Sequence, residues 1–361
     1  MKCHSRLQQY FKEVAEKSEK ERTLQWKVSS FVHSAKIRCI EPLSDDSYCI
    51  ADESKKVSII SSDAVRSNSE NKHNVCTELC VLEDSLATTS LAISSGCGLV
   101  ASCSNEPVVR VIQLSNKTDE GGSTPPRIQK YKFKENVRCA HFCSDDRNGS
   151  TALIAGGTLA ISLMDCQTKQ VFQEIRASNS KSNPIVSLMP VGDGCLLLTG
   201  FLDKSLKVWD LRVKSHPIRV IEPLLNALGP VSSTTHLDSC GRILARADSI
   251  GQIYFEDFLS GKKISKIKFS DSSKVQSIRF ANETATQGLY LSAATEHIQY
   301  LCCINSSKIL TPELQKVENT KRVRWNRNNA DEFVSLSEDR CMNVYRLISS
   351  EVENGHNNVE N

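Results

Sequence analysis

The sequence predicts an all-β protein: a seven-bladed β-propeller closed by an N-terminal strand, with a short helix before it. Three observations predict this fold. A pattern of short, alternating apolar strands recurs seven times, and equivalent positions in successive units lie 43 to 52 residues apart. The last unit lacks an outer strand, and the apolar stretch Trp26–Phe31 precedes the first unit and can supply it. Pairing the two ends in one sheet would close the ring.

The fourth unit is the clearest. An apolar strand, Cys195–Thr199, leads to a turn that contains Asp203, and a second alternating strand ends in Trp209-Asp210. Two further strands precede this pair, so four short strands fill one unit. We expect Thr199, Asp203, Trp209 and Asp210 to be the structural residues of this unit.

The other units follow the same order of strands. Their first strands are predicted at Ile37–Ile40, Thr89–Ile93, Val137–Phe142, Val231–His236, Val275–Phe280 and Lys321–Trp325. The positions equivalent to Trp209 are predicted at Ile60, Ile112, Met164, Phe255, Cys302 and Tyr345. A radial arrangement of such sheets buries each between two neighbours.

The segments outside the units divide the chain into three parts. We expect residues 1–25 to be a helical or linker segment, 26–347 the propeller and 348–361 a disordered acidic tail. Apolar residues at helical spacing, from Leu7 to Val14, predict a helix within 5–22. A helix that dimerises or binds a partner and a helix packed on the propeller rim both remain open.

Charge and cysteine content indicate the compartment. The chain has 45 Lys and Arg against 42 Asp and Glu, a net charge of +3, which does not suggest a general nucleic-acid role. The first residues do not run into an apolar leader segment, so we expect a cytoplasmic location and reduced thiols. Several of the 15 cysteines lie in apolar strands and are predicted core residues, namely Cys39, Cys49, Cys139, Cys195 and Cys302. No apolar run is long enough to cross a membrane.

Catalytic and metal-binding motifs are missing from the sequence. It contains no phosphate-binding loop, no His-Glu-x-x-His pattern and no Gly-x-Ser-x-Gly pattern. Cys139, His141 and Cys143 share one strand face, but structural zinc usually needs four ligands. We therefore expect no cofactor, no metal and no catalysis. An enzyme with its site at the channel mouth remains the alternative.

The repeat resembles the WD-repeat family across residues 26–347, and the Trp209-Asp210 unit carries the likeness most clearly. His33 is the one histidine that can take the place of the family's loop histidine. From Gly157 to Tyr345 the chain also resembles nemitin-type WD-repeat proteins, which associate with microtubules. The resemblance implies a non-catalytic protein-interaction scaffold, with the cytoskeleton as a candidate location. A subunit of an RNA-processing or ubiquitin-ligase type assembly is the alternative.

Basic residues recur where the inner strands begin. The first positions of these strands are predicted to be Arg38, Thr89, Arg138, Val186, Ser232, Gln276 and Lys321, a basic and neutral set. The predicted partner-binding residues around one channel mouth are Lys36, Arg38, Lys134, Arg138, Lys274, Lys321 and Arg322. Such a patch attracts acidic or disordered protein segments, for which tubulin tails are one candidate. Alternatively, these side chains pair with the rim carboxylates Glu41, Glu135 and Glu318. We expect a monomeric propeller that binds neither membranes nor specific nucleic acids.

Overall fold

The computed structural model describes most of the chain as β-strands. The described residues are 25–44, 46–67, 75–83, 85–114, 126–145, 150–191, 195–213, 216–224, 237–248, 250–269, 274–281, 290–295, 298–303, 308–309, 314–316, 320–326 and 332–348. The predicted helix within 5–22 and the tail after Ile348 lie outside them. The helical elements bounded within the described part are α2 (Ser62–Arg66) and the 3-10 turn η1 (Ser95–Cys97).

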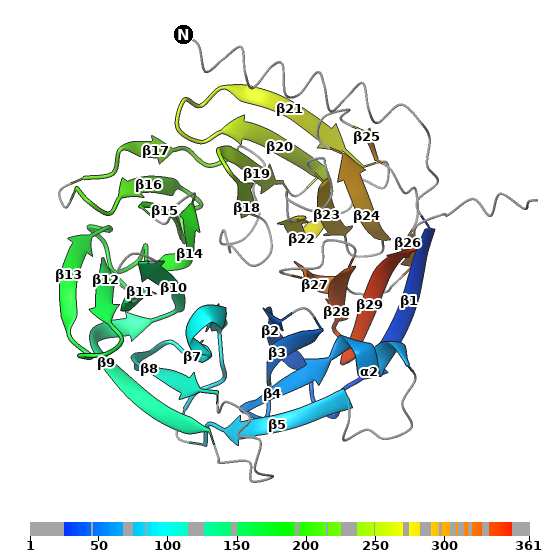
Figure 1. The fold of residues 1–361 in the computed structure, drawn as a ribbon. Coiled ribbons are helices and arrows are strands. Elements are labelled where there is room, and N and C mark those ends of the chain that lie inside the picture. The colour runs from blue at the N-terminus through cyan, green and yellow to red at the C-terminus, as the bar shows by residue number, and fades with distance from the viewer. Residues whose placement is uncertain are drawn as a thin grey trace, which may run out of the picture.

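The strands form antiparallel sheets arranged around a central axis in chain order (Figure 1). The first sheet contains β2 (Ile37–Ser44), β3 (Ser47–Asp52), β4 (Lys56–Ser61) and β5 (Cys76–Val81). The second contains β6 (Ser90–Ser94), β7 (Leu99–Cys103), β8 (Glu106–Gln113) and β9 (Arg127–Val137). The third contains β10 (Cys139–Asp145), β11 (Ser150–Gly156), β12 (Ala160–Asp165) and β13 (Val171–Arg176).

The second half of the chain continues the ring. One sheet contains β14 (Ile185–Val191), β15 (Leu196–Phe201), β16 (Leu206–Asp210) and β17 (Arg219–Ile221). The next contains β18 (Leu237–Cys240), β19 (Ile243–Ala247), β20 (Gln252–Asp257) and β21 (Lys263–Lys268). Another is built on β22 (Val275–Phe280), β23 (Tyr290–Thr295) and β24 (Ile298–Cys303). The closing sheet contains β27 (Thr320–Trp325), β28 (Glu332–Ser337), β29 (Cys341–Ile348) and β1 (Gln25–Val32).

The expectation of seven four-stranded blades is wrong. Six four-stranded blades are found within the described residues. The sheet built on β22–β24 departs from the pattern, because two short strands, β25 (Lys308–Ile309) and β26 (Leu314–Lys316), both pair with β24. The sequence between these two strands contains Pro312, which has no N–H to donate to a strand ladder. The ladder on β24 is divided between β25 and β26.

Closure of the ring by an N-terminal strand is confirmed. β1 pairs antiparallel with β29 in unbroken register, from Gln25 opposite Ile348 to Val32 opposite Cys341. In Figure 1 the first and last strands lie side by side at the outer edge of the closing sheet. The pairing covers an edge of β29 that would otherwise present free N–H and C=O groups.

The hydrophobic core lies between neighbouring sheets, in clusters that each join two of them. Ile40 and Tyr48 of the first sheet pack with Val334 and Met342 of the closing sheet, which buries the seam where the ring closes. Four of the predicted core cysteines, Cys39, Cys49, Cys139 and Cys302, are buried, whereas Cys195 is half-buried. Burial raises the pKa of the Cys139 thiol to about 12, so it stays protonated like an apolar core side chain.

The β14–β17 sheet shows how the predicted structural residues act. Trp209 Nε1 donates to Thr199 Oγ1 at 2.9 Å, and both side chains are fully buried. Asn183, in the loop before β14, donates to Asp203 Oδ2 at 2.7 Å and accepts from Asp203 N at 2.9 Å. The asparagine thus takes the loop position for which the sequence offered no histidine. Asp210 binds Arg212 through both carboxylate oxygens, at 2.9 and 2.7 Å.

His33 occupies the loop position expected of it. Its Nε2 lies 3.1 Å from Asp52 Oδ2, and both side chains are buried. The inner strand predicted at Val231–His236, with Ser232 near its start, lies outside the described residues. The described inner strand of that sheet is β18, which contains Asp238 and Ser239 and begins just after the predicted strand ends.

Candidate partner-binding surface

Four of the seven predicted basic residues gather at the seam between the first sheet and the closing sheet. Lys36 and Arg38 lie at the start of β2, and Lys321 and Arg322 lie at the start of the neighbouring strand β27. We call these four residues the basic patch. They meet because the first and last sheets of the ring are neighbours, although almost 300 residues separate them in the sequence.

The basic patch is only partly neutralised. Glu338, in the turn between β28 and β29, accepts from Lys36 at 3.0 Å and lies 3.3 Å from Lys321. Glu53, in the turn between β3 and β4, lies 3.9 Å from Arg38. Hydrogen bonds from the two lysines hold the pKa of Glu338 below its usual value. Within the described residues, four cations face two carboxylates, which leaves a local excess of positive charge.

The remaining three residues lie elsewhere. Arg138 joins β9 to β10 and is separated from the basic patch by the whole β6–β9 sheet. Lys274 precedes β22 in the sheet beside the closing sheet. No described contact joins either residue to the basic patch. Lys134 lies on the outer strand β9 at the rim and not at the channel mouth.

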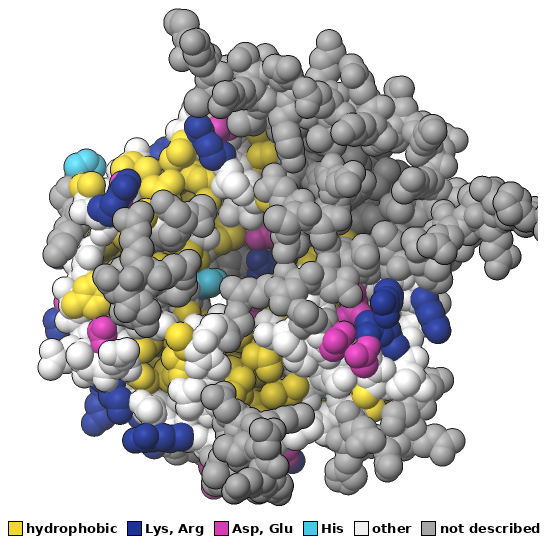
Figure 2. All heavy atoms as spheres, viewed as in Figure 1, with side chains coloured by type: hydrophobic (Ala, Val, Ile, Leu, Met, Phe, Trp, Pro, Cys, Tyr) yellow, Lys and Arg dark blue, Asp and Glu magenta, His cyan; other side chains and the backbone are white. Residues whose placement is uncertain are grey.

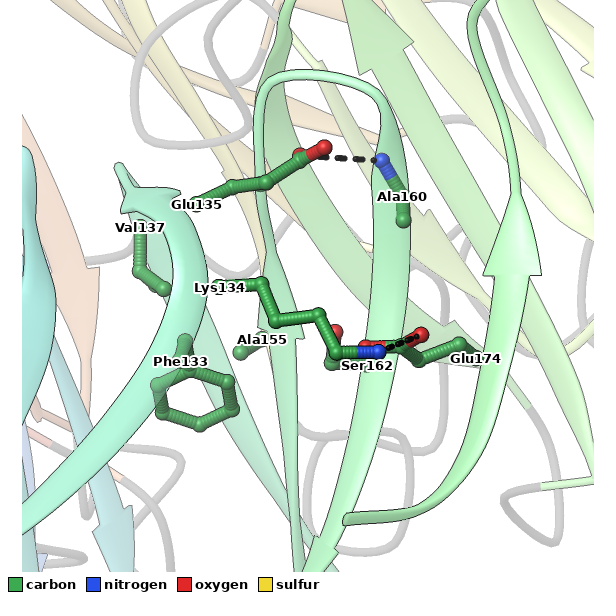
Figure 3. A pocket seen from close by; sticks show the side chains of 9 residues that line it. Phe133, Lys134, Glu135, Val137, Ala155, Ala160, Ser162 and Glu174 are labelled. Carbon is green, nitrogen blue, oxygen red and sulfur yellow. Dashed lines mark hydrogen bonds and ion pairs between the residues drawn. The ribbon is translucent and has the colours of Figure 1, made fainter.

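Lys134 was misplaced because β9 has no turn signal at its end. The strand runs for 11 residues to Val137, and β10 starts at Cys139, so the expected loop is almost missing. Lys134 Nζ donates to Glu174 Oε2 of β13 at 2.8 Å (Figure 3). The neighbouring Glu135 turns to the hairpin between β11 and β12, where Leu159 N and Ala160 N donate to it at 2.7 and 3.3 Å.

The carboxylates expected to neutralise the basic residues are not the ones found. Glu41 lies on β2 and binds Arg324, Glu135 binds backbone N–H groups, and Glu318 lies outside the described residues. The observed partners are Glu338, Glu53 and Glu174.

Sequence reasoning missed a layer of charged residues on the inner strands. Arg324 of β27 contacts Glu41 of β2 at 2.9 Å, and Arg279 of β22 donates to Asp238 of β18 at 3.0 Å. Phe280 N also donates to Asp238, at 2.7 Å. Figure 2 shows acidic, basic and histidine side chains at the central opening. The sequence did hold a signal for this layer, because its members share one position on equivalent inner strands. Each lies two residues after an equivalent residue: Glu41 after Cys39, His141 after Cys139, Arg279 after Ser277 and Arg324 after Arg322.

Opposite charges balance in this layer. Burial raises the pKa of Glu41, but the charges of Arg324 and Arg279 outweigh it and hold that pKa below its usual value. Burial, together with the charge of Arg279, lowers the pKa of Arg324 to about 10. The carboxylates of Glu41 and Asp238 are each paired with an arginine, which leaves them poorly suited to act as a general base. Within the described residues, no group of three or more His, Cys, Asp and Glu side chains could hold a metal ion.

No protein-family model matches this sequence. Among solved structures, the chain is similar to the crystal structure of the WD40 beta propeller domain of Doa1, with a TM-score of 0.66 and 13% identity. The likeness covers 91% of this chain and 98% of that one. At this identity it shows the fold alone, a β-propeller. The narrower resemblance to nemitin-type proteins stays a prediction.

Within the described residues, no helix is long and apolar enough to cross a membrane.

Proposed function

We propose that this protein is a non-catalytic interaction scaffold that binds acidic segments of partner proteins at the basic patch. The observation that supports the proposal is the meeting of Lys36, Arg38, Lys321 and Arg322 at the seam. Among the residues that the structure describes, Glu338 and Glu53 are the carboxylates found paired with them. Each lysine pair with Glu338 is more than a third exposed, so these ion pairs are weak and an incoming carboxylate can replace them.

The proposed partners are disordered acidic tails. Such a tail has no fixed shape to match, and attraction to a basic patch speeds its encounter with the scaffold in a manner that salt weakens. The acidic tails of tubulin are the partner that the nemitin-type resemblance suggests. Binding to them would associate the protein with cytoplasmic microtubules.

The test is microtubule co-sedimentation with a charge-reversed variant. The variant changes Lys36, Arg38, Lys321 and Arg322 to Glu. The matched control reverses four exposed lysines at β21, namely Lys262, Lys263, Lys266 and Lys268. We expect the parent and the control to co-sediment at low salt and to release at moderate salt, and the basic-patch variant to stay in the supernatant.

Two results would contradict the proposal. One is salt-insensitive binding that the basic-patch variant retains. The other is that the parent protein binds neither microtubules nor an isolated polyglutamate peptide. Circular dichroism of each variant shows whether the fold is intact, which separates loss of the patch from loss of the structure.

A further inference from the structure

A groove of about 480 Å³ lies on the rim between two outer strands, far along the ring from the basic patch. Its walls come from β9 and β13, and its lining residues are Lys132, Phe133, Lys134, Val171, Phe172, Gln173 and Glu174. It adjoins a deeper cavity of about 70 Å³ whose floor contains Ala155, Gly157 and Ala160 (Figure 3).

Both outer strands contain backbone that has no ladder partner within the described residues. β13 is the last strand of its sheet, so its outer edge has no described partner strand. β9 pairs with β8 at Lys132 and again at Val137, but the register shifts between them, and residues 133–136 have no partner on β8. Pro107 of β8 falls within this shift, and it has no N–H to donate. Unpaired strand edges accept an extended peptide as an added strand.

The groove is basic on the β9 side. Lys132 and Lys134 are exposed and lie two residues apart on the same strand face, which places them roughly 7 Å apart. Acidic residues at alternate positions of an extended peptide have the same spacing. Figure 2 shows Lys and Arg side chains on the rim where β9 runs.

The acidic groups at the groove do not cancel this charge. Glu174 faces Lys134, whose side chain is 80% exposed, so the pair is weak and exchangeable. Glu135 is held by two backbone N–H groups of the hairpin between β11 and β12. Lys132 can therefore bind an incoming carboxylate, and Lys134 can exchange Glu174 for one.

The β13 side of the groove is apolar and exposed. Phe172 is 56% exposed and Val171 is 37% exposed, while Phe133 lines the opposite wall. Aromatic side chains at a rim gain stability when a ligand covers them, because apolar area leaves water. A ligand that satisfies both walls carries acidic and apolar side chains in one extended segment.

We infer that the β9–β13 groove binds an extended acidic segment of a partner protein, which adds as a strand to the edge of β13. Its carboxylates contact Lys132 and Lys134, and its apolar side chains cover Phe133 and Phe172. This site is separate from the basic patch and does not depend on the proposed function there.

The test uses a fluorescein-labelled nine-residue peptide in which Glu alternates with Val and Phe, followed by fluorescence polarisation. We expect Lys132→Glu and Phe172→Ser each to weaken binding at least tenfold. Glu174→Gln should strengthen binding several-fold, because it removes the carboxylate that competes for Lys134. A structural role for these residues would not produce both a gain and a loss. Methylating alternate backbone nitrogens of the peptide should abolish binding, because an added strand needs those N–H groups.

The controls separate this site from others. Ile264→Ser and Lys266→Glu make the same kinds of change on the outer strand β21, and both should leave affinity unchanged. The basic-patch variant should also bind the peptide normally. Equal affinity for Lys132→Glu and the parent, an equal loss in the β21 controls, loss of binding in the basic-patch variant, or no binding by the parent would each overturn the inference.

Discussion

Arg246 and Glu256 of the β18–β21 sheet occupy the strand positions that Thr199 and Trp209 occupy in the β14–β17 sheet, so the prediction that Phe255 is the equivalent of Trp209 is wrong by one residue. The strand pairing establishes the match. Trp209 pairs with Leu197, and Thr199 follows Leu197 by two residues. Glu256 pairs with Leu244 in the same way, and Arg246 follows Leu244 by two residues. Trp209 donates to Thr199 at 2.9 Å, and Arg246 Nε lies 2.9 Å from Glu256 Oε1. One sheet is thus joined by a neutral hydrogen bond and the next by an ion pair that is about nine-tenths buried.

The neutral bond predicts a large effect of substitutions in the β14–β17 sheet. Trp209→Ala should reduce the free energy of unfolding by roughly 3–5 kcal/mol, because it leaves a cavity. Thr199→Val should cost about 1–3 kcal/mol, because Trp209 Nε1 loses its acceptor in a buried place. Chemical denaturation measures both. Val220→Ala on the exposed edge strand β17 is the control, and a Trp209→Ala loss below about 1 kcal/mol contradicts the packing described.

The ion pair predicts a non-additive result. Glu256→Leu alone leaves the buried Arg246 without its carboxylate partner, so the free energy of unfolding should fall by roughly 3–5 kcal/mol. Arg246→Met alone should have a similar effect. The double variant replaces both charges with apolar groups and should recover much of the loss. A double-mutant cycle by urea denaturation measures the coupling energy. Strictly additive losses would show that the two side chains do not act as a pair.

The strands near the axis were predictable because each is buried between two sheets. Their apolar runs, such as Leu196–Thr199 and Val334–Leu336, are visible without knowledge of their neighbours. The outer strands were harder. β9 alternates lysine with half-buried residues, and only the packing of β13 against it shows that Lys134 lies at the rim.

Polar residues joined across long sequence separations could not be predicted. Asp238 lies outside the first strand predicted for its unit, Val231–His236, and its partner Arg279 lies 41 residues away. Asn183 gives no signal of its own, because asparagine is common in loops and only the contact with Asp203 reveals its role. His33 was predictable because no other histidine precedes an inner strand at that distance, and Asp52 supplies its partner.

Removal of β1 tests closure of the ring. Deleting residues 1–32 exposes the edge of β29, so we expect aggregation and a lower melting temperature. Deleting only residues 1–24 retains β1 and serves as the matched control, which should stay monodisperse. Size-exclusion chromatography and thermal denaturation report both outcomes. Equal solubility and melting of the two deletions would contradict closure by this strand.

The Glu41–Arg324 pair predicts an acid dependence of stability. Because the folded state lowers the pKa of Glu41, the pair stabilises the fold above the carboxyl's unfolded pKa. This contribution is lost as the pH falls through the lower, folded pKa. Glu41→Gln should be less stable than the parent at neutral pH, and its stability should fall less between about pH 5 and about pH 3. Parallel acid limbs in urea denaturation would show that Glu41 does not contribute this dependence.

Zero-length carbodiimide crosslinking of the parent protein to a polyglutamate peptide, read by mass spectrometry, tests the central claim most directly. The reagent joins a carboxylate only to an amine in contact with it. The account predicts crosslinks at Lys36 and Lys321, which salt suppresses, because both lysines lie in the basic patch at the seam. Crosslinks spread evenly over exposed lysines, or concentrated on Lys263 and Lys266 of β21, would contradict it.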